Sequence, residues 1–202
     1  MADKNIVDLD VNGTLTTSDL LELYQPAQTP KNRQLSLGNL RTWLQTAFAS
    51  LVISASGIKF PATQIPSADA NTLDDYEEGV FIPNITFGGG STGIAYSVQQ
   101  GQYTKHGRTV IYTLRIILTS KGSSTGNAVL TGMPFNCNSV YYFIQSLSLS
   151  GTTFSGYPQA RVNISTDQIS LLETTTGGTF TTIDDTNFSG TDLIIVSGIY
   201  TV

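Results

Sequence analysis

Residues 109–118, with the sequence TVIYTLRIIL, decide the fold class of this chain. Every second position carries an apolar side chain, and the series is Val110, Tyr112, Leu114, Ile116 and Leu118. Successive side chains of a β-strand point to opposite faces of the sheet, so the series predicts a strand with one wholly apolar face. Such a strand is stable only when further strands complete the sheet and cover that face.

Other runs of β-forming residues on both sides of this strand supply the rest of a sheet. Gly- and Ser-rich segments separate the runs, such as GGG at 88–90 and GSSTG at 122–126. The predicted strands are residues 80–87, 93–103, 108–119, 128–131, 139–150, 160–165, 168–173 and 192–202. Several strands at this spacing predict a mainly β fold, an antiparallel β-sandwich of jelly-roll-like form, for the domain 79–202.

The chain before the predicted sheet has a different character. Residues 57–78 are predicted to form an extended linker, because Pro61 and Pro66 lie among small polar residues. Residues 1–56 are predicted to form an anchoring arm with one short helix, and a helical turn capped by Thr17 or Ser18 is expected to run to Tyr24. The apolar candidates for docking this arm on a partner are Ile6, Leu9, Leu20, Leu21, Leu23 and Tyr24.

Residues 36–53 contain the pattern of the predicted helix, with Ser36 as its N-cap. Its apolar positions are spaced alternately three and four residues apart, as in a heptad repeat. These candidates for an oligomer interface are Leu37, Leu40, Leu44, Ala47 and Leu51. Two interpretations stay open: a bundle of parallel helices from several copies, or a single amphipathic helix that lies on its own domain.

The composition excludes several classes of protein. Charged residues make up 12% of the 202 residues, where about 25% is usual, and the net charge is −5. Because no basic cluster is present, we expect no nucleic-acid binding. No apolar run reaches the ~20 residues that cross a bilayer, and the N-terminal residues lack the apolar core of a signal peptide. We therefore expect a protein made in a cytoplasm, without membrane insertion.

Residue types suited to catalysis or metal binding are sparse. Cys137 is the one cysteine and His106 the one histidine, and we expect a buried thiol and an exposed turn histidine. The gap between sequence positions does not show whether Asp167 and the pair Asp184–Asp185 approach each other as glycosidase acids do. The acidic cluster of Asp74, Asp75, Glu77 and Glu78 lacks the spacing of a calcium loop, and whether it binds a cation stays open. We predict no catalytic residue, no metal and no cofactor.

One long segment resembles a known family. Residues 60–79 are FPATQIPSADANTLDDYEEG, residues 87–93 are FGGGSTG, and GQYTK follows at 101–105. The resemblance continues through TSKGSSTGNAVLTGMPF at 119–135 and is to bacteriophage tail-fibre and related virion appendage proteins. Phe81 stands where this module commonly carries Trp, which keeps an apolar anchor. The resemblance implies a virion protein with a β-sandwich domain, usually a homotrimer.

The resulting hypothesis is a structural virion protein. It is a trimeric phage tail fibre or tail-attached appendage that docks through the arm and presents the β-domain for adhesion or assembly. The alternative is a capsid decoration or baseplate protein without a host-binding role. A polysaccharide-degrading tailspike would need a long β-helix with repeats, and none is visible, so we expect no enzyme. The expected partners are further copies of the chain, other tail or capsid proteins, and a host surface polysaccharide or protein. The receptor-binding residues are unknown, although Tyr96, Tyr103 and Tyr157 are suited to stacking on sugar rings.

Overall fold

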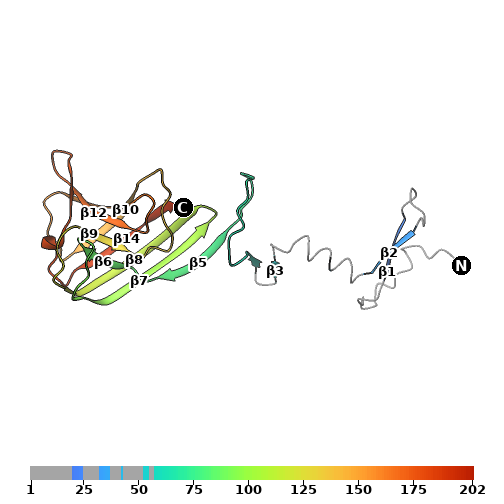
Figure 1. Ribbon diagram of the computed structural model, residues 1–202, viewed down its shortest axis with the longest axis horizontal. Helices are drawn as coiled ribbons and strands as arrows, with labels where there is room; N and C mark the ends of the chain where they lie inside the picture. Colours follow the sequence, from blue (N-terminus) through green and yellow to red (C-terminus); the bar gives the residue numbers. More distant parts are fainter. Residues whose placement is uncertain (1–19, 25–31, 37–41, 43–51, 55–56) are drawn as a thin grey trace. The chain divides into compact units, whose positions relative to one another are not determined.

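The computed structural model describes residues 20–24, 32–36, 42, 52–54 and 57–202 (Figure 1). The chain divides into two compact units, Met1–Pro61 and Ala62–Val202. The division falls within the segment 57–78 that the sequence predicted as a linker. Each unit is described by itself below.

The described residues of the first unit form two short antiparallel pairs of strands. Strand β1 (Leu20–Tyr24) pairs with β2 (Asn32–Ser36), and β3 (Val52–Ser54) pairs with β4 (Gly57–Lys59). The predicted helical turn that runs to Tyr24 is therefore wrong. The residues of β1 form five cross-strand pairs with β2, and this pairing provides hydrogen-bond partners for their backbone N–H and C=O groups. A single capped helical turn would leave most of these groups without partners.

The predicted helix 36–53 is wrong at its C-terminal end and otherwise untested. Ser36 ends β2, and Val52 and Ile53 lie in β3, where β-branched side chains are favoured. Thr42 is helical. The five candidates for the oligomer interface lie outside the described residues, and they are Leu37, Leu40, Leu44, Ala47 and Leu51. Of the docking candidates, Leu20, Leu21, Leu23 and Tyr24 lie in β1, whereas Ile6 and Leu9 lie outside the described residues.

The second unit is built on one antiparallel ten-stranded sheet. Its strands in chain order are β5 (Tyr76–Phe81), β6 (Asn84–Phe87), β7 (Ile94–His106), β8 (Thr109–Lys121), β9 (Ala128–Thr131), β10 (Phe143–Ser150), β11 (Tyr157–Val162), β12 (Ile169–Thr174), β13 (Phe180–Thr182) and β14 (Leu193–Thr201). A short 3-10 helix, η2 (Asp185–Asn187), precedes β14. The order across the sheet is β5-β7-β8-β14-β10-β11-β12-β9-β6, and β13 pairs with β12.

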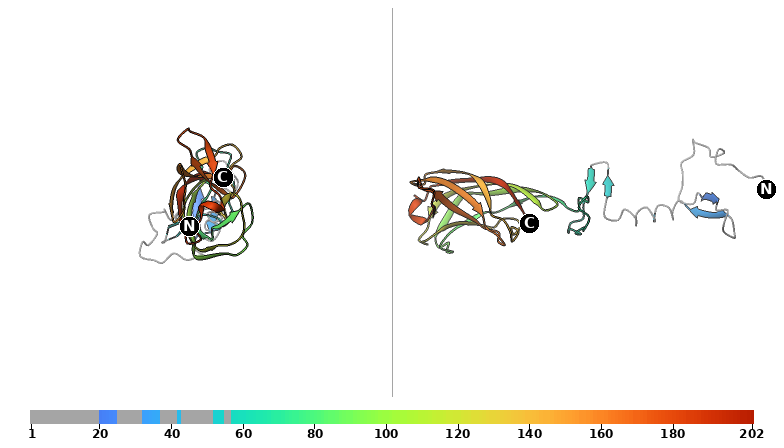
Figure 2. Two further views of the ribbon diagram at one scale, coloured as in Figure 1. Left: turned by 90° about the vertical axis from the view of Figure 1, so that its left-hand side faces the viewer. Right: turned by 90° about the horizontal axis from the view of Figure 1, so that it is seen from above.

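Strand β10 turns this sheet into a curled half-barrel (Figure 2). Its residues 146–150 pair with β14, whereas residues 143–145 pair with β11. One strand thus belongs to both halves, and the sheet folds over the core without a break. The predicted mainly antiparallel β fold is confirmed. The jelly-roll-like sandwich is not, because the strands form one continuous sheet instead of two separate ones.

Most predicted strands are present, with shifted ends. The predicted strand 80–87 is divided into β5 and β6 around Pro83, because proline lacks the N–H that a ladder requires. The predicted strand 139–150 begins only at Phe143. Strand β13 had no clear signal, since its three residues are all exposed.

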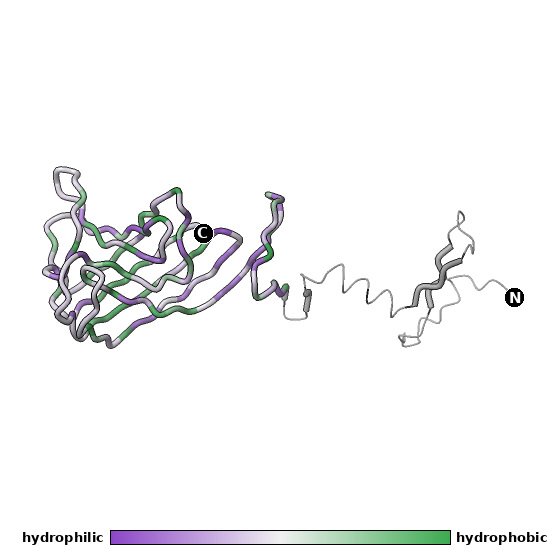
Figure 3. The backbone as a smooth tube through the Cα atoms, in the orientation of Figure 1, coloured by the Kyte–Doolittle hydropathy of each residue, from purple (hydrophilic) through white to green (hydrophobic). Residues whose placement is uncertain are grey.

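The core lies inside the curl and follows the alternation of β8. All five apolar positions of that series, Val110 to Leu118, are at most 3% exposed. The other large side chains that are almost completely buried include Ile85, Phe87, Leu130, Ile169, Leu171, Ile183, Ile194 and Tyr200. Apolar segments are accordingly spread along the strands of the whole sheet (Figure 3). The burial of these faces is the main force that stabilises the unit.

Two glycines let aromatic rings lie flat on the inner side of β5 and β7. Gly79 is the cross-strand partner of Tyr103, and Gly101 is the partner of Phe81. A Cβ atom added at Gly101 would stand 2.5 Å from the ring of Phe81, and one at Gly79 would stand 2.6 Å from the Tyr103 hydroxyl. Each ring therefore covers the backbone of the glycine opposite, which stabilises the end strand of the sheet.

A buried ion pair ties the segment before β5 to the sheet. The Lys105 ammonium, in β7, binds the carboxylate of Asp75, and the two residues are 3% and 5% exposed. Gln64 Oε1 lies 3.4 Å from the same nitrogen, and the Phe135 ring centroid lies 5.5 Å from it. The pair therefore fixes part of the predicted linker 57–78 against the sheet.

This ion pair should show a non-additive effect on stability. Lys105→Met leaves a buried, unpaired carboxylate and should lower the free energy of unfolding by about 3–5 kcal/mol. Adding Asp75→Leu to that variant should recover most of the loss, because the unpaired charge is removed. Urea unfolding of the two variants and the parent chain measures this directly. Equal losses in the single and double variants would show that the pair is not buried in solution.

Candidate interaction surface

The second face of the curled sheet points away from the core and carries several exposed aliphatic residues. In β8 the residues between the core positions are exposed or half-buried, and they include Ile111, Thr113 and Arg115. Cross-strand partners share a face, so the register carries this face across the sheet. Ile111 faces Ile199 in β14, and Thr113 faces Gln102 in β7, which in turn faces Val80 in β5.

Five exposed aliphatic residues form what is called here the aliphatic face: Val80, Ile82, Ile111, Ile144 and Ile199. Val80 is 85% exposed and Ile82 67% exposed. Ile144 extends the row from Ile111 to Ile199, because Ser146 pairs with Ser197, two residues along each strand. Ile111, Ile199 and Ile144 form a contiguous row, and Thr104 and Gln102 of β7 separate this row from Val80 and Ile82. Single exposed apolar residues are common on proteins, but contiguous rows of them mark contact surfaces.

Two hollows lie side by side on this part of the sheet. One has a volume of about 530 Å³, and its lining includes Val80, Ile82, Gln100, Arg115 and Ile195. The other has a volume of about 580 Å³, and its lining includes Glu78, Val80, Thr104 and Ile111. The side chains that border them are mostly aliphatic or uncharged. Such a surface suits an extended protein contact better than a small polar ligand.

The charges of this surface are one acid and one base. Glu78 and Arg115 are the charged residues among those that line the two hollows. The ion pairs among the described residues are Lys105–Asp75 and Lys121–Asp185, so neither of these two side chains takes part in one. Glu78 accepts a hydrogen bond from the Tyr76 hydroxyl. An acid and a base that form no ion pair with the described residues thus lie on one surface.

The acidic cluster around Tyr76 is divided among separate partners. Asp75 binds Lys105, and the Asp74 carboxylate accepts from the Ser67 backbone N–H at 2.9 Å. Glu77 accepts from the Tyr103 hydroxyl, and Glu78 from that of Tyr76. The alternation of β5 sends neighbouring carboxylates in different directions. Within the described part of the chain, no group of three or more His, Cys, Asp or Glu residues is placed to hold a metal ion.

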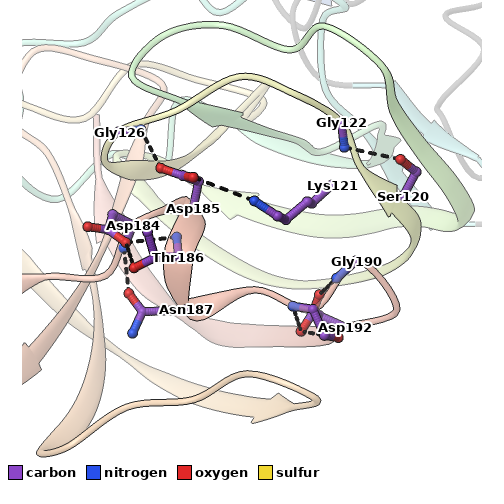
Figure 4. Close-up of polar contacts among 11 residues, drawn as sticks. Ser120, Lys121, Gly122, Gly126, Asp184, Asp185, Thr186, Asn187, Gly190 and Asp192 are labelled. Atoms are coloured by element: carbon purple, nitrogen blue, oxygen red, sulfur yellow. Dashed lines mark hydrogen bonds and ion pairs between the residues drawn. The ribbon is translucent and has the colours of Figure 1, made fainter.

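The aspartates near the end of the chain stabilise loops (Figure 4). Asp184 caps η2 by accepting from the Thr186 N–H at 2.9 Å. Asp185 accepts from the Gly126 N–H at 2.7 Å, with Lys121 Nζ 3.5 Å away. The Gly126 N–H, and then Lys121, lower the pKa of the Asp185 carboxyl below its ordinary value. Both carboxylates are thus committed to backbone contacts, and the absence of an enzymatic activity stays a prediction.

Asp192 is completely buried in the next loop and has no cation beside it in the described residues. Its carboxylate accepts from the Gly190 N–H at 2.7 Å and from the Ser189 N–H at 3.1 Å. Backbone donors in this number can hold a carboxylate in a buried site. Asp192 therefore has a structural role in the turn that enters β14.

The tyrosines that the sequence proposed for sugar stacking have different environments. The Tyr96 hydroxyl accepts from the Ile85 N–H at 3.3 Å, and Tyr103 packs edge-on against Phe135. Both rings therefore support the fold. Tyr157 is 70% exposed at the start of β11, a strand that contributes no residue to the aliphatic face. It is the member of the three that a ligand can reach.

The expectations for the histidine and the cysteine are confirmed. His106 is exposed at the end of β7, and its ring meets the edge of the Tyr76 ring. Cys137 is buried, its thiol lies 3.6 Å from the Tyr141 carbonyl, and burial raises its pKa. Sequence reasoning missed the aliphatic face, although Ile111 and Ile117 on the second face of β8 were a visible signal.

Comparison with known proteins gives one similar fold and no family. No family model matches the chain, and no curated protein matches it. The crystal structure of Dettilon tailspike protein (gp208) has a TM-score of 0.53 and 21% sequence identity to this chain. The similar region covers 62% of this chain and 24% of that chain. At this identity the similarity shows a shared fold alone. No helix among the described residues is long and apolar enough to span a membrane.

The lowered pKa of Asp185 predicts a specific pH dependence. A carboxylate whose folded pKa is depressed stabilises the protein above its ordinary pKa of 3.8, and the contribution is lost as the pH falls below that value. The melting temperature of Asp185→Asn should therefore lie furthest below that of the parent near neutral pH and approach it at lower pH. Lys121→Met should produce a smaller version of this change, because the Gly126 N–H has the larger effect on Asp185. A gap between parent and Asp185→Asn that is constant from pH 7 to pH 2 would contradict the assignment.

Proposed function

We propose that this chain is a structural virion protein, a phage tail fibre or tail-attached appendage. The observation that carries the proposal is the similarity of its curled β-sheet to part of Dettilon tailspike protein. The sequence supports it independently, since residues 57–135 resemble the module found in tail-fibre and related virion proteins. The low content of charged residues and the absence of a metal cluster in the described residues also suit a structural role.

In this proposal the two units have different roles. Residues 1–56 form the arm that docks on the particle, and Leu37 to Leu51 form the helical seam between three copies. The β-unit serves adhesion or assembly, and the reachable Tyr157 ring is available to a host polysaccharide. The chain has no enzymatic activity in this scheme. A capsid decoration or baseplate protein would use the same β-unit without contacting the host.

Labelling of purified particles tests the location. Gold-conjugated antibodies against Ala62–Val202 should bind to the tails of intact particles, and mass spectrometry should detect the chain among the particle proteins. Gold over the capsid would favour the decoration alternative, and gold at the baseplate alone would favour a baseplate component. Absence of the chain from the particles would contradict both versions of the proposal.

Replacement of Leu40 and Leu44 by Ser tests the helical seam. Each change should cost roughly 2–5 kcal/mol if the side chain is packed between subunits. Sedimentation equilibrium should then show dissociation at higher protein concentrations than for the parent, with the melting temperature of the β-unit unchanged. A single helix that lies on its own domain predicts the reverse, which is a lowered melting temperature at an unchanged molecular mass.

A further inference from the structure

We propose that a second copy of this chain docks on the aliphatic face, with Glu78 of one copy paired to Arg115 of its neighbour. This contact lies within the β-unit and is distinct from the helical seam at residues 37–51. It goes beyond the proposed function, because it follows from the described sheet whatever particle the chain belongs to.

The first argument is the exposure of the aliphatic face. Val80, Ile82 and Ile144 are more than half exposed, and Ile111 and Ile199 are about half exposed. Ile111, Ile199 and Ile144 lie on the adjacent strands β8, β14 and β10, whereas Val80 and Ile82 lie in and just after β5, beyond β7. A partner that covers all five also covers the Thr and Gln side chains of β7 between them. The opposite side of the same strands is already filled by the core. Water is the least favourable neighbour for such a surface.

The second argument is the charge, which selects the partner. A nucleic acid or an anionic membrane surface requires several basic residues, and the lining of the two hollows contains Arg115 alone. A sugar requires exposed rings, but Phe81, Tyr103 and Tyr112 in the same lining are packed on the core. A second copy presents the same aliphatic residues, and its Glu78 can form an ion pair with Arg115 of the first copy. Charges on the two surfaces are then complementary.

The third argument is that Glu78 and Arg115 cannot pair within one chain. On β7, Glu78 faces Thr104, whereas Arg115 faces Gln100. These two positions on β7 are four residues apart, which is about 13 Å along the strand. Glu78 and Arg115 are also separated by the width of β7, because β5 and β8 flank that strand. An ion pair requires the charged atoms to be within about 4 Å. The symmetry of a homo-oligomer brings the two residues of different copies together, once per contact in a ring or twice in a twofold dimer.

Cross-linking of the full chain tests the contact directly. The variant that carries Glu78→Cys and Arg115→Cys together should form disulfides between subunits under mild oxidation. Denaturing gels should then show covalent dimers and higher species that a reductant removes. The two positions are too far apart for an internal disulfide, which needs Cα atoms within about 7 Å. Cys137 is buried and does not compete.

A matched control uses a cysteine outside the surface. Glu78→Cys combined with Tyr157→Cys places the second thiol at an exposed residue of β11, and this variant should stay monomeric on the gel. Equal cross-linking of both variants would show random collision and overturn the proposal. The proposal would also be overturned if the parent chain is a monomer in solution, or if the Glu78→Cys/Arg115→Cys variant does not cross-link.

Charge reversal gives a second readout that does not depend on thiols. Arg115→Glu alone places two acids in the contact and should shift dissociation to at least tenfold higher protein concentration in sedimentation experiments. Addition of Glu78→Arg restores an opposite pair and should return the dissociation toward that of the parent. Failure of the exchange to restore association would count against the pairing. These measurements use purified protein, so their failure would leave the location on particles untouched, and absence from particles would leave the contact intact.

Discussion

The apolar side of β8 is the constraint on which the rest of the structure depends. This strand lies between β7 and β14, and both neighbours pair with it over most of their length. Its five alternating apolar residues need cover, and a flat sheet cannot provide it. The sheet therefore curls until its later strands lie over β8. Strand β10 makes that curl continuous, because its two ends pair with different neighbours.

The buried carboxylates of the β-unit have fixed hydrogen-bond donors. Asp75 is buried beside Lys105, and Asp192 is buried among backbone N–H donors. Asp184 and Asp185 hold the loops before β14 through backbone N–H groups. In each case the carboxylate obtains fixed donors in exchange for the water it loses. These contacts explain why a chain with few charged residues still places several of them in its interior.

A polar but sparsely charged surface has a consequence for association. Charged side chains normally keep exposed sheet faces apart, and inward or outward lysines are a common device for doing so. On the aliphatic face, Val80 and its neighbours take the places where such charges would stand. The face is then suited to a fixed contact in a larger assembly, which agrees with the proposed role of the chain as a virion component.

The sequence by itself determined the mainly β class, most of the strands, the burial of Cys137 and the exposure of His106. These follow from short-range rules, since period-two alternation and glycine-rich turns act over a few residues. Only the tertiary structure decided that the strands form one curled sheet, that Asp75 pairs with Lys105 thirty residues away, and that Ile111 lies beside Ile199. Strand order and cross-strand register place residues side by side that are far apart in the chain. Alternation in the sequence predicts that a side chain is exposed, but it does not show which other exposed side chains lie beside it.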